Sequence, residues 1–417
     1  MKKIYNLRFN TQDFSKIFCS GVSMCHYQII MSSVLETYKR RNISFAKGKG
    51  AHLYSTTGEK YLDFLSGIAV NSLGHCHPHV VRALKKQSNK LWHVSNVYVI
   101  PEQEQLAKRL CDVSFADYVT FVNSGAEAVE TSIKIARKYF FETGKPNKNR
   151  IITFAGAEHG RTLAAQFAGN NKEETVGFDP RVDGFDQVPF GDHSALKQSI
   201  NEKTAAIMIE TIQGKGGIRV ASNDSLKFLK KLCDDNDLLL ILDEVQCGIG
   251  RTGKFFAFEN AGIEPDIVTV AKGLGNGFPI GACLVNKKVA VGMKPNSHGS
   301  TFGGNPLAMA VGNAVLDVIL KKDFLEHVQE MGEYFDSGLK ELQNRYPNII
   351  EEVRGIGLMK GIKLKVDNLK FCDKLFDHKL LTRQSGDNVI RLLPPLIIKK
   401  KEIDIALNAI DKTCSNF

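Results

Sequence analysis

The sequence predicts an α/β protein with a mostly parallel central sheet in a large domain and a smaller α+β domain at its carboxyl end. From about Tyr118 onward, short β-branched runs alternate with helical patterns, which is typical of a parallel sheet covered by helices. After Pro306, longer helical patterns and a hairpin-like stretch replace this alternation. A chain of 417 residues, 43% of them hydrophobic, is also more than one core usually organises.

Short apolar runs are the predicted strands of the large domain: residues 118–122, 151–154, 205–209, 238–242, 267–271 and 282–285. Between the third and fourth runs, Ser222 or Asn223 is a candidate helix cap ahead of leucines at helical spacing. Three further elements are expected past Pro306: a helix over 324–346, a hairpin at 353–358 and an amphipathic helix near 403–410.

The predicted domain organisation has four parts: an extension at 1–30, a segment at 31–58 that joins the small domain, a large ligand-binding domain at 59–306 and the small domain at 307–417. The extension carries four basic residues against one acidic residue and lacks a long apolar core, so it is no secretory signal. We expect it to be disordered or outside the mature fold. An organelle transit peptide and a translation start placed too far upstream of Met31 both stay open.

Composition excludes several classes of protein. No apolar stretch approaches the ~20 residues that cross a bilayer, so the chain is expected to be soluble. The formal charge of +10 is spread along the chain, which favours a solvated surface and acidic small substrates over nucleic acid. Nine scattered cysteines without CxxC spacing indicate a reducing compartment. The cytoplasm is expected, or an organelle if residues 1–30 are a transit peptide.

Two opposite charges stand at the ends of predicted core strands. Asp243 closes the run 238–242, and Lys272 closes the run 267–271, 29 residues further along. A buried charge is costly unless it is paired, so a charged ligand between these strand ends is predicted. Pyridoxal phosphate needs both groups, because its ring nitrogen stays protonated beside a carboxylate and its aldehyde is held by an amine.

A phosphate site is predicted where Ser124, Gly125 and Ala126 follow the first strand and open a helix. Helix N-terminal amides attract anions, and glycine lets the backbone approach them closely. An ordinary strand-to-helix turn explains the same residues equally well.

Two further patterns point to other kinds of site. The stretch 248–255 matches GxGxxG and most of the P-loop pattern, which makes a nucleotide-binding protein the rival from another class. Against it, Phe255 stands where a magnesium-binding hydroxyl belongs. His75, His77 and His79 resemble a metal cluster, but no second ligand group follows at zinc spacing, so a structural role is favoured and no metal is expected.

Several motifs in order resemble those of the class III aminotransferases, of the ornithine and 4-aminobutyrate type, in the fold-type I pyridoxal phosphate family. They lie at residues 123–128, 159–162, 242–246, 271–273, 299–306 and 391–395. The resemblance runs from about Val34 to the carboxyl end. Within the class, the stretches 91–96 and 243–253 are most similar to acetylornithine aminotransferases.

The resemblance implies a role for each cofactor residue. Lys272 would hold the cofactor covalently and then move the proton at the substrate carbon, while Asp243 would hold the pyridinium proton. Val245 would pack on one face of the ring, and Gln246 would bond its phenolic oxygen. The remaining implied cofactor contacts are Ser124, Gly125, Ala126, Glu158 and, from the neighbouring subunit of a homodimer, Thr301.

The resemblance also implies the substrate contacts. Arg391 would bind the α-carboxylate of glutamate or 2-oxoglutarate in a two-pronged fashion that lysine could not copy, and Arg161 would take the carboxylate of the acetylated diamino acid. Glu210, Lys215 and Ser300 complete the predicted substrate site. The implied activity moves an amino group between N-acetylornithine and 2-oxoglutarate in arginine biosynthesis. Ornithine, succinylornithine, succinyldiaminopimelate and 4-aminobutyrate are the rival donors.

Four residues depart from the family pattern at this site. Glu158 stands where the family has an aromatic residue, and Lys215 stands where it has a glutamate that pairs with the arginine at position 391. Thr211 replaces a proline, and Asn276 interrupts a glycine run. We hypothesise that Glu158 lies near enough to Lys215 or Arg391 to neutralise one of them. A weakened or inactive paralogue that keeps the fold is the alternative.

Overall fold

The structure is a computed structural model that describes residues 33–417. The extension predicted at 1–30 therefore lies outside the described residues. The chain divides into two units, residues 1–43 and 44–417, and within the described residues all helices and strands lie in the second. The predicted domain limits inside this second unit stay predictions. No helix of the described part is both long and apolar enough to span a membrane.

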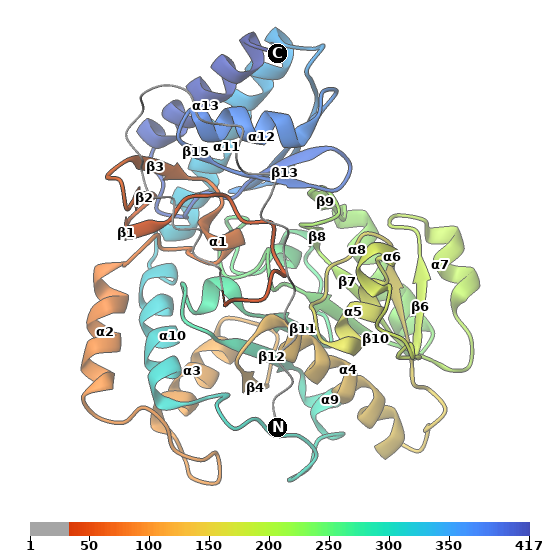
Figure 1. Cartoon of the computed structure of the whole chain (residues 1–417). Helices are drawn as coiled ribbons and strands as arrows, with labels where there is room; N and C mark the ends of the chain where they lie inside the picture. The colour runs from red at the N-terminus through yellow and green to blue at the C-terminus, as the bar shows by residue number, and fades with distance from the viewer. Residues whose placement is uncertain (1–32) are drawn as a thin grey trace, which may run out of the picture. The chain divides into compact units, whose positions relative to one another are not determined.

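A seven-stranded sheet forms the centre of the 44–417 unit (Figure 1). Its order is β4-β12-β11-β10-β7-β5-β6, and neighbouring strands are parallel except in the two pairs that involve β12. The predicted, mostly parallel sheet is therefore confirmed. The strands are β4 (Tyr118–Val122), β5 (Arg150–Phe154), β6 (Phe185–Val188), β7 (Thr204–Glu210), β10 (Leu239–Asp243), β11 (Ile267–Val270) and β12 (Gly281–Val285).

The apolar runs predict these strands because the sheet is buried on both faces. Along β10, Leu240 and Leu242 enter one hydrophobic core, while Leu239 and Ile241 enter the core on the opposite face. A strand covered on both sides reads as a continuous apolar run. The edge strand β6 has no such run, because its sequence FDQV is half polar and only Val188 is buried.

Helices cover the two faces of this sheet. Residues of α4 pack into one core, and residues of α3, α8 and α10 pack into the other. The helix predicted after residue 222 is α8, and the Ser222 hydroxyl caps it by accepting a hydrogen bond from the Ser225 amide at 3.1 Å. The helices of this part are α2 (Pro78–Ser88), α3 (Pro101–Asp112), α4 (Gly125–Glu142), α5 (Leu163–Gly169), α6 (Lys172–Thr175), α7 (His193–Ser199), α8 (Asn223–Asp235), α9 (Lys287–Ala290) and α10 (Pro306–Ile319).

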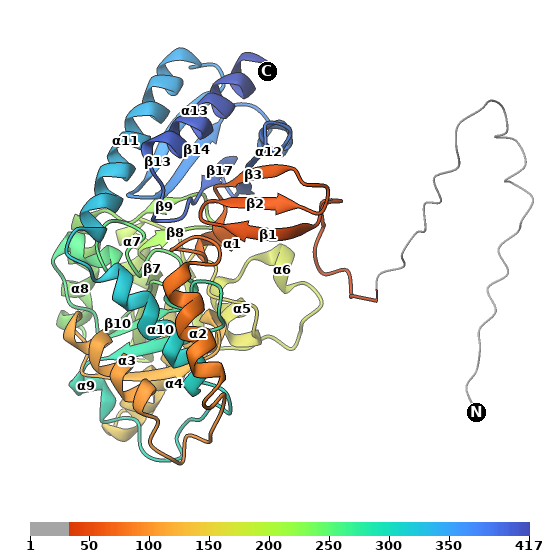
Figure 2. The ribbon, with the colours of Figure 1, turned by 90° about the vertical axis from the view of Figure 1, so that its left-hand side faces the viewer.

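A second hydrophobic core joins the beginning of the described chain to its carboxyl end. Two four-stranded sheets and three helices enclose it, and Figure 2 shows β1, β2 and β3 beside this carboxyl-terminal part. The helices predicted over 324–346 and near 403–410 are α11 and α13, and the predicted hairpin is formed by β13 and β14. The elements are β1 (Phe45–Lys49), β2 (His52–Ser55), β3 (Lys60–Asp63), β13 (Ile350–Ile356), β14 (Met359–Leu364), β15 (Leu380–Leu381), β16 (Arg383–Ser385), β17 (Val389–Leu392), α11 (Phe324–Arg345), α12 (Asn368–Asp377) and α13 (Lys400–Ser415).

The remaining elements are short and connect these layers. They are α1 (Ser66–Ala69), the paired strands β8 (Ile212–Gln213) and β9 (Arg219–Val220), and the 3-10 helices η1 (Ala257–Ala261) and η2 (Lys272–Leu274).

Candidate active site

The two charges predicted at strand ends lie at the same edge of the sheet. β10 and β11 are parallel neighbours, with Asp243 in register with Thr269, and Lys272 begins η2 just beyond β11. Both side chains line one pocket of about 350 Å³. Predicted cofactor residues that line the same pocket are Ser124, Gly125, Ala126, Glu158 and Val245.

Asp243 is held rigidly by its neighbours. Its Oδ1 accepts hydrogen bonds from the Val245 amide at 3.0 Å and from the Thr269 hydroxyl at 3.2 Å. Its Oδ2 lies 2.8 Å from Nδ1 of the buried His159. Burial alone would lower the pKa of His159, but the hydrogen bond and charge of Asp243 outweigh it, and the pKa is raised. Asp243 is therefore hydrogen-bonded to His159 on one side and lines the pocket on the other.

His159 has a role at the site that the sequence reasoning did not assign. Its position in a motif marked it, but no pattern in the sequence relates it to Asp243, which is 84 residues away. Its Nε2 is buried without a hydrogen-bond partner among the described residues. The contact of His159 with Asp243 is formed by the tertiary fold and could not be predicted from the spacing of the two residues in the sequence.

Lys272 combines a strained backbone with a lowered side-chain pKa. Its φ of 30° lies in the left-handed region, which a residue with a side chain rarely adopts. Such strain persists where the surrounding structure fixes it, and it concentrates at functional positions. Burial lowers the pKa of Lys272, the carboxylate of Asp243 opposes the shift, and Arg391 adds to it. A lowered pKa increases the fraction of the lysine that is the neutral, nucleophilic amine.

The predicted phosphate end is a helix N-terminus with no room for an extra carbon. Ser124 caps α4 by accepting a hydrogen bond from the Glu127 amide at 3.2 Å. A Cβ on Gly125 would lie 2.7 Å from Cγ1 of Val245. The first turn of α4 therefore approaches the Val245 side chain closely, and its free amides face the pocket end where an anion is stabilised.

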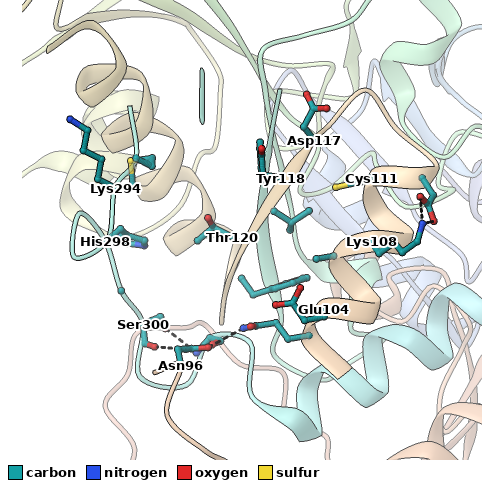
Figure 3. Close-up of a pocket in the computed structure, with 18 residues that line it drawn as sticks. Asn96, Glu104, Lys108, Cys111, Asp117, Tyr118, Thr120, Lys294, His298 and Ser300 are labelled. Atoms are coloured by element: carbon teal, nitrogen blue, oxygen red, sulfur yellow. Dashed lines mark hydrogen bonds and ion pairs between the residues drawn. The ribbon is translucent and has the colours of Figure 1, made fainter. Parts of the chain in front are cut away.

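Some predicted residues lie outside this pocket in the single chain. Gln246 Oε1 is buried and has no hydrogen-bond partner among the described residues, so it is free to bond a ligand. Thr301 is exposed and does not line the pocket. Ser300 borders a larger pocket of about 700 Å³, where Asn96 Nδ2 donates to its carbonyl at 3.0 Å (Figure 3).

Arg391 and Glu210 are buried ionisable residues near the pocket. Arg391, on β17, is 7% exposed, and no described carboxylate lies within ion-pair distance of it. Burial lowers its pKa to about 10. Glu210 ends β7, and its Oε2 accepts a hydrogen bond from the Glu158 amide at 3.0 Å. Burial raises the pKa of Glu210.

The hypothesis that Glu158 neutralises a nearby cation is confirmed for Lys215. Glu158 Oε2 lies 2.5 Å from Lys215 Nζ, and Glu158 Oε1 lies 3.1 Å from Arg161 Nε. Glu174 on α6 pairs with the same two cations. The sequence offered no signal for Glu174, because a loop and a four-residue helix bring it to the site. We call these four residues the charge cluster: Glu158, Arg161, Glu174 and Lys215.

The other two departures from the family pattern have structural roles. The Thr211 hydroxyl donates a hydrogen bond to the buried Glu244 at 2.6 Å, which a proline could not do. Asn276 adopts a φ of 45°, a conformation that asparagine tolerates better than most residues. Its Oδ1 accepts a hydrogen bond from the Leu73 amide at 2.7 Å.

Residues of the two patterns that suggested a nucleotide or metal site also make structural contacts. In the loop 248–253, the buried Arg251 donates to the Leu358 carbonyl at 3.2 Å. His75 lies 2.8 Å from Asp63, and His79 lies 2.7 Å from Asp317, so these two histidines face different partners. Residues 33–417 contain no group of three or more potential metal ligands.

The pocket fits pyridoxal phosphate at each end. A fixed carboxylate, a lysine of lowered pKa and a closely packed helix N-terminus lie around one cavity. These groups match the ring nitrogen, the aldehyde and the phosphate. Gln246 Oε1 and Arg391 Nε are buried without a hydrogen-bond partner among residues 33–417. Fold and site together define a pyridoxal-phosphate-dependent transferase of the α/β type.

Comparison with known proteins gives the family. The sequence model of the family 'Aminotransferase class-III' matches residues 36–414. The chain belongs to this family of pyridoxal-phosphate-dependent aminotransferases.

Similar proteins include an acetylornithine aminotransferase of Agrobacterium fabrum, 54% identical over 92% of this chain and 96% of its own length. Among solved structures, ornithine aminotransferase from Toxoplasma gondii has a TM-score of 0.89 at 32% identity, covering 92% of this chain and 93% of that one. N-acetylornithine aminotransferase from Stenotrophomonas maltophilia has a TM-score of 0.80 at 36% identity, with coverage of 91% and 97%.

Proposed function

We propose that this aminotransferase moves an amino group between N-acetylornithine and 2-oxoglutarate, the transfer expected in arginine biosynthesis. The 54% identity to the acetylornithine aminotransferase of Agrobacterium fabrum supports this donor. Backbone similarity does not separate the donors, because the ornithine enzyme from Toxoplasma gondii has a TM-score of 0.89 at only 32% identity. Side chains in the substrate pocket decide the donor, and sequence identity reflects them better.

The observation that carries the proposal is the buried guanidinium of Arg391, which has no carboxylate within ion-pair distance among residues 33–417. A buried guanidinium without a carboxylate is strongly unfavourable, so a carboxylate ligand is the expected partner. The planar fork of arginine binds a carboxylate through two hydrogen bonds. Arg391 also contributes to the lowered pKa of Lys272, so the two cations lie within electrostatic range of each other. A substrate with an amine and a carboxylate satisfies both.

The residues of the pocket divide the work of the reaction. When bound, pyridoxal phosphate supplies an electron sink that stabilises negative charge on the carbon bearing the amine. Lys272, whose pKa is lowered by burial, takes the proton from that carbon and returns it. Asp243, fixed by Thr269 and His159, presents its carboxylate at the strand end. The first turn of α4 would bind the phosphate through its free amides.

The working form is proposed to be a homodimer. Large apolar side chains are exposed on the loop at 91–99 and at Phe302, beside the 700 Å³ pocket that Ser300 borders. Exposed apolar patches of this kind mark protein interfaces. A second copy on this surface would bring Thr301 of the partner subunit to the phosphate end, since this chain's own Thr301 lies outside its cofactor pocket.

A donor panel tests the proposal. Purified enzyme is mixed with 2-oxoglutarate and with N-acetylornithine, ornithine, succinylornithine, succinyldiaminopimelate or 4-aminobutyrate, and glutamate formation is followed. We expect kcat/KM for N-acetylornithine to exceed that for ornithine by at least about tenfold. The Lys272→Ala variant gives the blank. A higher value for another donor would reject the assigned substrate, and no turnover with any donor would favour the inactive paralogue.

A further inference from the structure

Glu174 and Glu158 hold Arg161 and Lys215 in a compensated charge cluster. Glu174 Oε1 lies 2.8 Å from Arg161 Nη2 and also pairs with Lys215 Nζ. Glu158 reaches the same two cations through its two oxygens, at 3.1 Å and 2.5 Å. Two carboxylates therefore balance two cations. A substrate carboxylate that binds Arg161 has to replace one of them.

The two carboxylates are anchored in different ways. Glu158 lines the pocket of Asp243 and Lys272, and its backbone amide is bonded to the buried Glu210. Glu174 lies on α6, a four-residue helix in which no residue is buried, and its backbone carbonyl accepts a hydrogen bond from the Gln166 side chain. Segments with few buried contacts move at low free-energy cost. Of the two carboxylates, Glu174 is therefore the one expected to move when a substrate carboxylate binds Arg161.

The two cations hold Glu174 unequally. The Arg161 side chain is 61% exposed, and the Lys215 side chain is 30% exposed. Ion pairs of exposed groups are weak because water screens them. Glu174 therefore leaves Arg161 more readily than it leaves Lys215, although one oxygen contacts both.

We propose that Glu174 occupies the place of a substrate carboxylate on Arg161 and moves aside when substrate binds, while Lys215 retains it. Glu174 and Lys215 then set the affinity for carboxylate substrates without taking part in the proton transfer. This inference rests on the proposed function, in which Arg161 receives a substrate carboxylate.

Binding of glutarate to the holoenzyme tests this role. Glutarate carries two carboxylates but no amine, so its binding, measured by isothermal titration calorimetry, does not depend on which donor the enzyme uses. Glu174→Gln removes the competing carboxylate, and we expect glutarate to bind at least about threefold more tightly. Glu173→Gln removes the same charge from the next residue of α6, whose side chain is exposed, and is expected to change the affinity less than about twofold.

Lys215→Gln should act in the opposite direction. Without Lys215, Glu174 pairs with Arg161 alone, so glutarate should bind more weakly. In the Glu174→Gln background the Lys215→Gln effect should shrink, because the carboxylate through which Lys215 acts is gone. Equal effects of Lys215→Gln in both backgrounds would overturn the role of Lys215. Equal affinities of the Glu174→Gln and Glu173→Gln variants would overturn the role of Glu174.

Hydrogen exchange of the unmodified holoenzyme tests the movement without a substitution. Amides at 170–178 should exchange faster in the presence of glutarate, because Glu174 loses one of its two anchors. Slower or unchanged exchange would contradict the displacement. If Glu174→Gln tightens glutarate binding while N-acetylornithine is not the preferred donor, the assigned substrate fails and the competing carboxylate stands.

Discussion

Glu210 is a carboxyl group that the fold keeps from ionising. It is 4% exposed, accepts the Glu158 amide through Oε2 and lies among the charges of His159, Asp243 and Lys272. Burial raises its pKa from 4.5 toward about 8, because the charged form loses its hydration. A proton on Glu210 limits the negative charge beside Asp243. This leaves Asp243 as the fixed carboxylate of the pocket.

The raised pKa predicts that Glu210 costs stability as the pH rises. In the unfolded chain the group loses its proton near pH 4.5, whereas in the folded protein it keeps it until about pH 8. Wild type should therefore lose stability relative to Glu210→Gln across this window, by about 1–3 kcal/mol, and the difference should level off above it. Glutamine keeps the acceptor for the Glu158 amide. Thermal unfolding midpoints of both proteins across this pH range measure the difference.

The exposed Glu173→Gln variant is the control for this titration. Its unfolding midpoint should follow that of wild type at each pH, because Glu173 is surrounded by water. A difference between Glu210→Gln and wild type that stays constant across the window would contradict a raised pKa.

At the scale of elements, strand ends and a helix start build the pocket. β10 and β11 end beside each other, and α4 begins where the chain leaves β4. The contact between Gly125 and Val245 sets how closely the first turn of α4 approaches the end of β10. This packing, rather than any single hydrogen bond, shapes the phosphate end.

Gly125→Ala should weaken cofactor binding. The added Cβ would meet Cγ1 of Val245 at 2.7 Å, so α4 has to shift away. We expect this overpacking to raise the dissociation constant of the cofactor about tenfold. Fluorescence titration of the apoenzyme with pyridoxal phosphate measures this constant. In a Val245→Ala background the same substitution should cost less, because the clashing methyl groups are absent. An undiminished cost in that background would contradict the steric explanation.

Much of this arrangement follows from the sequence, and the rest depends on tertiary contacts. Asp243 and Lys272 were predictable because each ends an apolar run that only a doubly covered strand produces. His159 was not, because its hydrogen bond to Asp243 spans 84 residues and leaves no periodic trace. Glu174 escaped prediction for a similar reason, since α6 has no apolar face that would place it. The Glu158–Lys215 pair was predictable from the family resemblance, because two departures of opposite charge fall at one site.

At the scale of the whole molecule, the single chain leaves part of the predicted cofactor site unfilled. Thr301 is exposed and lies outside the predicted cofactor pocket. Apolar side chains at 91–99 are exposed beside the 700 Å³ pocket that Ser300 borders. The proposed dimer with shared sites would account for both facts, because one interface would bury the apolar surface and supply the hydroxyl of Thr301.

Hybrid dimers test whether the sites are shared. Lys272→Ala and Thr301→Ala chains with different affinity tags are co-expressed, and dimers that carry one chain of each kind are purified. If Thr301 acts across the interface, one of the two sites in the hybrid keeps both native residues, and roughly half of the wild-type activity is expected. Each variant homodimer should be impaired. A hybrid no more active than the Thr301→Ala homodimer would mean that Thr301 acts within its own chain.

The central claim is that Lys272 holds pyridoxal phosphate in the pocket of Asp243. Borohydride reduction of the holoenzyme, followed by digestion and mass spectrometry, tests it directly, because reduction makes the link between an amine and the cofactor aldehyde permanent. We expect the cofactor label on the peptide that contains Lys272, and its loss in Lys272→Ala but not in Lys215→Gln. A label on another lysine, or no label in the wild type, would contradict the account.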